Sequence, residues 1–280
     1  MSSSEPAQKD SRLRRYVEAL TLTALGRRPA GRSLTVFPRD IYLVSYPRSG
    51  NTWTRFLVGN LLNGSDPVTF ANVERRVPTI YAWPDRTLRS LPRILKSHES
   101  FDPRYPRVIY ILRDPREVAV SLYYYLLKMG ALRDGYSIDD FVVRFIKADV
   151  VPYLDRMGCW EDHVLSWLRM RMGKPGFLLI RYEDLVDNPA KQLAKLAPLL
   201  GVDPTPEIIE RAVNECSAGN MRSLETKQSK DWLVTKKSRQ DIRFVREAKT
   251  GGWRDKLSAS SVLAIEQAWG ATMRELGYLT

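Results

Sequence analysis

The chain has 280 residues, 44% of them hydrophobic and 10% aromatic, and its 44 Lys and Arg against 32 Asp and Glu give a net charge of +12. This composition supports one large α/β domain, with no apolar run near the roughly 20 residues of a membrane span and no secretory signal. Two cysteines and two histidines exclude a disulfide framework and a zinc cluster, so we expect a cytoplasmic protein that uses no metal.

The positive charge is concentrated in two segments. Residues 1–39 hold eight basic and three acidic side chains (+5), and residues 222–256 hold eleven and five (+6). The rest of the chain is nearly balanced. A nucleic-acid-binding protein would interleave aromatic and basic residues on a sheet face, whereas the predicted strands are apolar. We therefore expect a basic, partly helical N-terminal arm over residues 1–39, one domain over residues 40–280, and no nucleic-acid partner.

Strands and helices alternate after the arm. The predicted elements are strands at Ile41–Ser45, Ile94–Lys96, Val108–Leu112 and Phe177–Ile180, and helices from Asn51, from Pro115, from Pro189 to Gly201, and over 258–276. Short apolar runs alternating with helical patterns indicate a parallel sheet covered by helices. The predicted fold is a single α/β domain with a central parallel sheet flanked by helices, and a ligand at the carboxyl ends of the strands.

The turn after the first predicted strand is suited to a phosphate. Its sequence is Tyr-Pro-Arg-Ser-Gly-Asn-Thr-Trp, from Tyr46 to Trp53. Strand, tight turn and helix present free backbone N–H groups to an anion, and Gly50 permits close approach. Ser49 and Thr52 add hydroxyl donors. The loop is P-loop-like but lacks the spacing of a Walker A motif.

That octapeptide resembles the 5′-phosphosulfate loop of the PAPS-dependent sulfotransferases, whose usual form is Tyr-Pro-Lys-Ser-Gly-Thr-Thr-Trp. Arg48 and Asn51 are departures from it. Further segments over residues 40–256 follow the family's order. The resemblance implies PAPS as co-substrate, PAP as product, and a cofactor-binding loop made of Arg48, Ser49, Gly50, Asn51, Thr52 and Trp53.

Two later segments resemble the family's 3′-phosphate site. Arg113 follows the third strand, and Ser121 lies eight residues on, within a helix. The segment from Phe244 to Arg254 resembles the family's C-terminal loop, which implies a second phosphate-binding guanidinium at Arg246. Glu247 and Ala248 replace the usual Lys and Gly there, so this part of the cofactor site departs from the family.

The resemblance also implies an adenine slot. Trp53 follows the phosphate loop, and Tyr182 lies in a Tyr-Glu-Asp-Leu motif after the fourth strand. The segment Cys216-Ser217-Ala218-Gly219-Asn220-Met221 aligns with the family's Thr-Ser-Phe-x-x-Met. We expect Cys216, Ser217 and Met221 to contact the cofactor. Ala218 replaces the Phe, so one aromatic wall is missing.

The resemblance assigns catalysis to His98, Lys96 and Arg48. Leu95-Lys96-Ser97-His98 matches the family's Lys-Thr-His, whose histidine is the base, and transfer to a hydroxyl requires removal of a proton near neutral pH. Arg48 and Lys96 would stabilise the charge that develops on the leaving phosphate. Because an Arg does not lose its proton, Arg48 can act only by electrostatics. His163 lies in a helical pattern without a motif, and we expect it to be structural.

The acceptor is the part that the sequence defines least. The segments 63–93 and 123–160, which should cover it, are rich in aromatic residues. They favour a hydroxyl or amine of a small molecule, with a carbohydrate or lipid hydroxyl as the alternative. A small-molecule kinase would need a Walker Lys, and a non-enzymatic nucleotide binder would have no use for His98. Both a monomer and a homodimer remain open.

Overall fold

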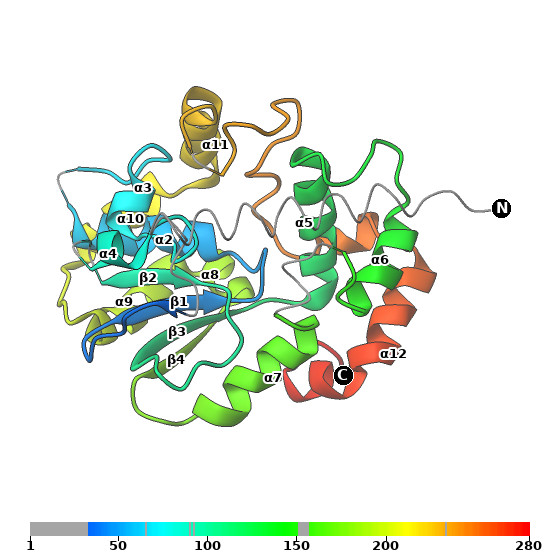
Figure 1. The fold of residues 1–280 in the computed structure, drawn as a ribbon, viewed down its shortest axis with the longest axis horizontal. Helices are drawn as coiled ribbons and strands as arrows, with labels where there is room; N and C mark the ends of the chain where they lie inside the picture. Colours follow the sequence, from blue (N-terminus) through cyan, green and yellow to red (C-terminus); the bar gives the residue numbers. More distant parts are fainter. Residues whose placement is uncertain (1–32, 65, 90, 92, 151–156, 233) are drawn as a thin grey trace.

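Four parallel strands form the centre of the computed structural model, which describes residues 33–280 except 65, 90, 92, 151–156 and 233. The strands are β1 (Ile41–Ser45), β2 (Ile94–Ser97), β3 (Arg107–Leu112) and β4 (Phe177–Arg181). They lie in the order β2-β1-β3-β4, with every neighbouring pair parallel (Figure 1). The predicted sheet is therefore confirmed. The expected basic arm lies mostly outside the described residues.

The sheet separates two hydrophobic cores. Successive side chains of a strand point to opposite faces, so Tyr42 and Val44 join one core and Ile41 and Leu43 the other. The first core includes α5 (Pro115–Lys128), α6 (Ile138–Ile146), α7 (Trp160–Arg171) and α12 (Ala259–Glu275). The second includes α2 (Asn51–Leu62), α9 (Pro189–Leu200) and α10 (Pro206–Glu215). Because both faces of the sheet are covered, its strands are mainly apolar, and their charged residues, Lys96, Arg107 and Arg181, lie at or next to strand ends.

Helix ends follow their local sequence. The Asp114 side chain accepts a hydrogen bond from the N–H of Arg116 at 2.8 Å and caps α5, in which Pro115 is the first residue. Gly201, with φ 74°, ends α9 in the left-handed conformation. The sequence patterns did not predict α6, α10, α3 (Val73–Arg76), α4 (Asp85–Leu88), α8 (Tyr182–Asp187), α11 (Ala218–Gln228) or the 3₁₀ helix η3 (Gly252–Asp255).

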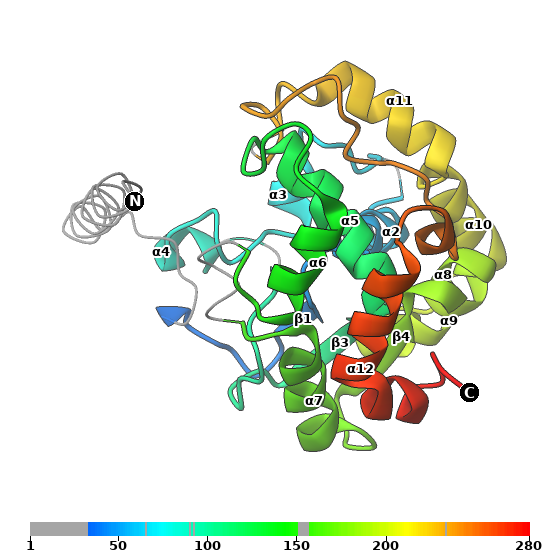
Figure 2. The ribbon, with the colours of Figure 1, turned by 90° about the vertical axis from the view of Figure 1, so that its right-hand side faces the viewer.

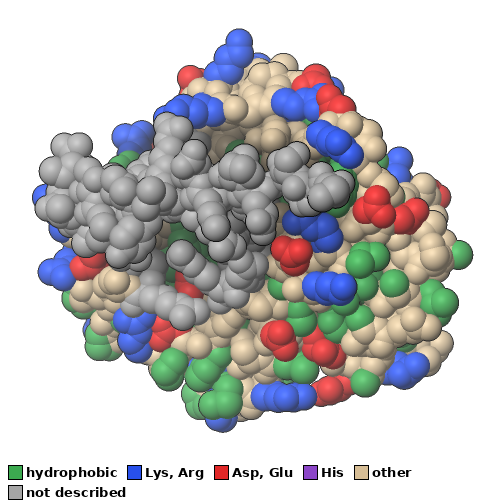
Figure 3. Space-filling model, turned by 45° about the vertical axis from the view of Figure 1, so that its right-hand side comes forward, with side chains coloured by type: hydrophobic (Ala, Val, Ile, Leu, Met, Phe, Trp, Pro, Cys, Tyr) green, Lys and Arg blue, Asp and Glu red, His purple; other side chains and the backbone are tan. Residues whose placement is uncertain are grey.

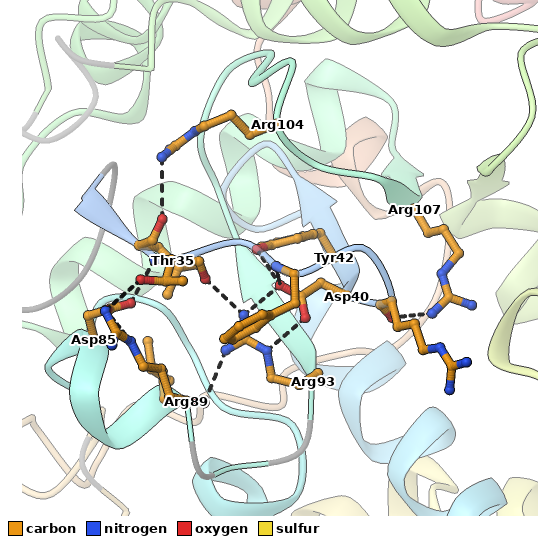
Figure 4. A network of polar contacts seen from close by, with 12 residues as sticks. Thr35, Asp40, Tyr42, Asp85, Arg89, Arg93, Arg104 and Arg107 are labelled. Atoms are coloured by element: carbon orange, nitrogen blue, oxygen red, sulfur yellow. Dashed lines mark hydrogen bonds and ion pairs between the residues drawn. The ribbon is translucent and has the colours of Figure 1, made fainter.

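A polar network holds the amino ends of the strands (Figure 4). Asp40, which precedes β1, is fully buried and accepts from Arg93 Nε at 2.7 Å and from the Tyr42 hydroxyl at 3.2 Å. Thr35 donates its backbone N–H to Asp85 on α4 at 2.7 Å. A buried carboxylate needs such partners, because an uncompensated buried charge is strongly destabilising. This edge is structural, and the carboxyl ends of the strands lie at the opposite edge.

Candidate active site

The predicted motifs meet at the carboxyl edge of the sheet. The phosphate loop follows β1, His98 follows β2, Arg113 follows β3 and Tyr182 follows β4. Because the four strands are adjacent and parallel, segments distant in sequence lie around one cavity of about 730 Å³. This volume falls within the range of small-molecule sites.

The cavity brings together nearly all of the predicted site residues. Those that line it are Arg48, Gly50, Asn51, Thr52, Trp53, Lys96, His98, Arg113, Ser121, Tyr182, Cys216, Ser217, Met221, Arg246, Glu247 and Ala248. Ser49 does not line it: this residue is 1% exposed, and its hydroxyl has no hydrogen-bond partner among the described residues.

The phosphate loop has the backbone that an anion site needs. Gly50 has φ 97°, and a Cβ at this position would lie 2.5 Å from the Tyr182 ring, so both conformation and space require glycine. Helix α2 begins at the next residue, and its first N–H groups have no partner within the helix. Arg48 also has positive φ (70°), which is uncommon for a residue with a side chain. The loop therefore holds strain beside its anion-binding backbone.

Arg48 connects the phosphate loop to two other segments. Its Nε donates to the Ser121 hydroxyl at 3.2 Å, and its guanidinium carbon lies 4.7 and 4.4 Å from the ring centres of Tyr125 and Phe244. The resemblance placed Arg48 and Ser121 on different phosphates of the nucleotide, whereas here they are in contact. Tyr125 and Phe244 were not predicted as its partners, because nothing in their spacing marks them.

Arg113 is fixed by its neighbours on three sides. It donates to the Arg48 carbonyl and to the Glu117 carboxylate, both at 3.1 Å, and its guanidinium carbon lies 3.9 Å from the centre of the Tyr182 ring. Its Nε is buried and has no hydrogen-bond partner among the described residues, which fits a site for an anion. Sequence reasoning missed Glu117, although its i, i+4 spacing from Arg113 was a signal.

The departures in the C-terminal loop have structural consequences. Arg246 lies over the Tyr124 ring at 4.2 Å. The Glu247 carboxylate pairs with Lys249 at 3.3 Å, so part of its negative charge is compensated. Ala248 has φ 52°, a conformation that a Gly adopts without strain. The Ala at position 248 is therefore less suited to its backbone conformation than a Gly would be.

The expected adenine slot lies beside α11. The Trp53 indole donates to the Cys216 carbonyl at 2.9 Å and lies edge-on to Tyr182, with ring centres 6.0 Å apart. Cys216 is 1% exposed, burial raises the pKa of its thiol to about 12, and its Sγ accepts from the Asn60 amide at 3.2 Å. The Ser217 hydroxyl accepts from the Asn220 N–H and caps α11. Ala218 lines the cavity where the family has Phe.

The hydrogen bonds of His98 define its tautomer. Its Nδ1 lies 2.7 Å from the Ser45 carbonyl oxygen, which can only accept, so Nδ1 carries the proton and Nε2 is left with a lone pair. The His98 backbone N–H donates to the Tyr81 hydroxyl at 2.8 Å, and its carbonyl accepts from His163 Nε2 at 3.1 Å. These contacts hold the imidazole with Nε2 free to accept a proton.

His163 and Asn51 support the surroundings of His98. The other nitrogen of His163, Nδ1, accepts from the Tyr110 hydroxyl at 2.9 Å, so this buried histidine is structural, as expected. The Asn51 amide donates to the Leu43 carbonyl and the Ser45 hydroxyl, at 3.1 and 3.2 Å. Asn51 therefore joins the loop to the strand whose last carbonyl orients His98.

Burial lowers the pKa of both His98 and Lys96. Burial, followed by the nearby Lys96 charge, holds the pKa of His98 well below its usual value. Burial and the Arg55 guanidinium lower the pKa of Lys96 to about 7, while Glu74 opposes that shift. Glu74 itself pairs with Arg55 at 3.0 Å. A neutral imidazole at physiological pH can accept a proton, as a general base must.

Among the described residues, no three His, Cys, Asp or Glu side chains are placed to hold a metal ion. In the same part of the chain, no helix has the length and apolar character needed to cross a membrane.

Comparison with known proteins agrees with this geometry. Residues 38–277 match the family model of the sulfotransferase domain. The chain belongs to the sulfotransferase family. Human sulfotransferase 2B1 is 30% identical to this sulfotransferase over 253 residues, covering 84% of this chain and 66% of that protein. Bovine sulfotransferase 1E1 is 27% identical over 235 residues, covering 78% of each. As a member of this family, the chain is a PAPS-dependent sulfotransferase.

Solved structures share the fold of this sulfotransferase. Retinol dehydratase in complex with androsterone and the inactive cofactor PAP has a TM-score of 0.71 at 21% identity, covering 87% of this chain and 83% of that one. Mouse sulfotransferase SULT7A1 complexed with PAP has a TM-score of 0.69 at 23% identity, with 88% and 87% covered. At these identities the likeness establishes the fold alone.

Proposed function

We propose that this sulfotransferase moves the sulfuryl group of PAPS to a hydroxyl of a small molecule, with His98 as the general base. The acceptor oxygen forms a bond to sulfur, and its proton passes to Nε2 of His98. The bond between sulfur and the 5′-phosphate oxygen breaks, and its electron pair leaves with PAP. The observation that carries this proposal is the 2.7 Å contact between His98 Nδ1 and the Ser45 carbonyl. Through this contact, the last residue of β1, the strand that precedes the phosphate loop, orients the His98 imidazole.

Arg48 and Lys96 would act on the leaving group. Negative charge grows on the bridging oxygen as sulfur departs, and a fixed cation there lowers the barrier. Arg48 supplies permanent charge. Lys96, whose pKa is about 7, is charged only in part of the molecules at neutral pH until an anion raises that pKa. Both side chains line the cavity beside the loop.

The remaining assignments concern the nucleotide. Arg113, Ser121 and Arg246 would bind the 3′-phosphate, and the first turn of α2 the 5′-phosphosulfate. The unpartnered Arg113 Nε supports the first assignment. Trp53, Tyr182, Cys216, Ser217 and Met221, which all line the cavity, would border the adenine.

A hydroxyl of a small, largely apolar molecule is the acceptor that the site favours. The cavity lining includes the aromatic or sulfur-containing side chains of Tyr81, Tyr125, Met157, Trp232 and Phe244. One relative, 29% identical over 227 residues, is the 3-beta-hydroxysteroid sulfotransferase of Cavia porcellus. An amine, or a carbohydrate or lipid hydroxyl, is the alternative acceptor. We keep the cytoplasm as the proposed compartment, since Cys159 and Cys216 are both free thiols.

A screen of alcohols, phenols, amines and sugars with PAPS, detecting released PAP, tests the proposal. We expect release that depends on an alcohol or phenol and is absent without acceptor. Release that depends only on amines or sugars would overturn the acceptor class. PAP formed at the same rate without any acceptor would contradict transfer.

The 3′-phosphate assignment predicts a selective loss of affinity. Arg113→Ala and Arg246→Ala should each weaken PAP binding more than about ten-fold, because hydrogen bonds to charged groups contribute roughly 1.5–3 kcal/mol. Ser121→Ala should have a smaller effect. Binding of AMP, which lacks the 3′-phosphate, should hardly change. Calorimetric titration of both nucleotides measures this, and an equal fall for PAP and AMP would refute the assignment.

The lowered pKa values of His98 and Lys96 predict how activity depends on pH. The lowered pKa of His98 keeps it neutral from weakly acidic pH upward, and Lys96 loses its charge as the pH rises through about 7. We therefore expect kcat/KM for PAPS, which reports the free enzyme, to be flat below neutrality and to fall above it. Lys96→Arg should remove the alkaline fall, since Arg keeps its proton. A fall unchanged in that variant would exclude Lys96 as its source.

A further inference from the structure

Two side chains of α11 hold the backbone of the C-terminal loop. The Glu225 carboxylate accepts from the N–H groups of Phe244 and Val245, at 2.5 and 2.9 Å. One turn earlier, Arg222 donates to the Arg246 carbonyl at 2.7 and 3.1 Å, and to the next carbonyl at 3.1 Å. Four consecutive residues, 244–247, are thus bound through their main chain. Figure 2 shows this segment returning alongside α11.

A buried lysine extends the same anchor to α5. Lys128, the last residue of that helix, is 1% exposed and donates to the carbonyls of Arg239 and Ile242, at 2.8 and 2.6 Å. Its ammonium lies 3.7 Å from Glu225, which is 7% exposed. Each buried charge is therefore matched, as burial requires. The segment that carries Arg246 is thus attached to α5 and α11, two of the helices that border the cavity.

This attachment has a direct consequence for the site. A main chain fixed on both sides of Arg246 restricts where its guanidinium can lie, and a group that is already placed loses less entropy on binding. Helix α11, which carries Arg222 and Glu225, also presents Ala218 and Met221 to the cavity. The adenine side and the phosphate side of the site are thus joined by one rigid element. Glu225 and Arg222 do not line the cavity, so they would act through Arg246.

We propose that Arg222 and Glu225 are positioning residues that determine selectivity for a nucleotide with a 3′-phosphate, by holding the loop that carries Arg246. The proposal rests on the proposed assignment of Arg246 to that phosphate. It places part of the discrimination between PAP and AMP in side chains that touch neither nucleotide.

Calorimetric titration with PAP and AMP tests the proposal on Arg222→Gln and Glu225→Gln. We expect PAP affinity to fall about five- to ten-fold in each, in keeping with the loss of charged hydrogen bonds to the loop, and AMP affinity to stay within about two-fold. The control is Lys227→Gln on the exposed face of α11, which should leave both affinities unchanged. Arg222 is only half-buried, so we expect Arg222→Gln to fold. If Glu225→Gln does not fold, the PAP and AMP affinities of Arg222→Gln test the proposal.

A double-variant cycle separates positioning from general damage. If Arg222 and Glu225 act through Arg246, adding either change to Arg246→Ala should cause no further loss of PAP affinity. Additive losses, or equal losses for PAP and AMP, would overturn the proposal. A failure of the underlying assignment has a different signature: Arg246→Ala alone would then leave the ratio of PAP to AMP affinity unchanged.

Discussion

Replacement of His98 by Ala is expected to lower kcat by about 10²–10⁴, the usual contribution of a general base, while PAP affinity stays within about three-fold. The imidazole faces the cavity through Nε2, because Nδ1 is bound to the Ser45 carbonyl. Its loss should therefore affect proton removal from the acceptor, and not the nucleotide. Single-turnover kinetics with PAPS and an alcohol acceptor, together with PAP titration, measure both quantities.

The second histidine provides a matched control. His163 is fully buried, bonds to the Tyr110 hydroxyl and the His98 carbonyl, and is not among the residues that line the cavity. His163→Gln should lower the melting temperature but keep more of kcat than His98→Ala does. More than a tenth of wild-type kcat in His98→Ala would remove His98 from the base role.

Replacement of Arg48 by Met is expected to reduce kcat by about 10²-fold or more, with smaller effects on the acceptor KM, because a fixed cation stabilises the leaving phosphate. Met retains apolar contact with Tyr125 and Phe244, the rings that flank the guanidinium at 4.7 and 4.4 Å. The change therefore removes charge more than packing. Arg48→Lys restores the family's usual residue and should stay within about ten-fold of wild type, because it keeps the cation.

Ser121→Ala separates the charge of Arg48 from its hydrogen bond. This change removes the 3.2 Å contact with Arg48 Nε and leaves the guanidinium in place. Its effect on kcat should be less than about ten-fold, since the charge remains. If Arg48→Met were nearly as active as Arg48→Lys, charge at this position would have no part in the chemistry, and Lys96 would be left as the stabilising cation.

Much of the scaffold was predictable because its signals are local. Apolar runs marked all four strands, Pro115 and Pro189 marked helix starts, and Gly201 marked a helix end. The convergence of the motifs was predictable too, because parallel strands place their carboxyl ends at one edge of the sheet.

The acceptor region was the least predictable part. Of the aromatic residues in the segments 63–93 and 123–160, Phe70, Phe141, Phe145 and Trp160 are core residues with at most 1% exposure. Tyr81 and Tyr125 line the cavity instead. Tyr153 lies outside the described residues. An aromatic side chain packs equally well in a core or a pocket wall, so composition does not separate the two.

The sequence by itself determined the family, the parallel α/β fold and the residues available for catalysis, because each depends on short runs whose spacing is read directly. Only the tertiary structure decided how these residues meet. It gave His98 its tautomer through the Ser45 carbonyl, joined Arg48 to Ser121, and tied the loop of Arg246 to Glu225. These contacts join segments far apart in the chain, and no local pattern specifies which polar groups will become partners once the backbone is folded.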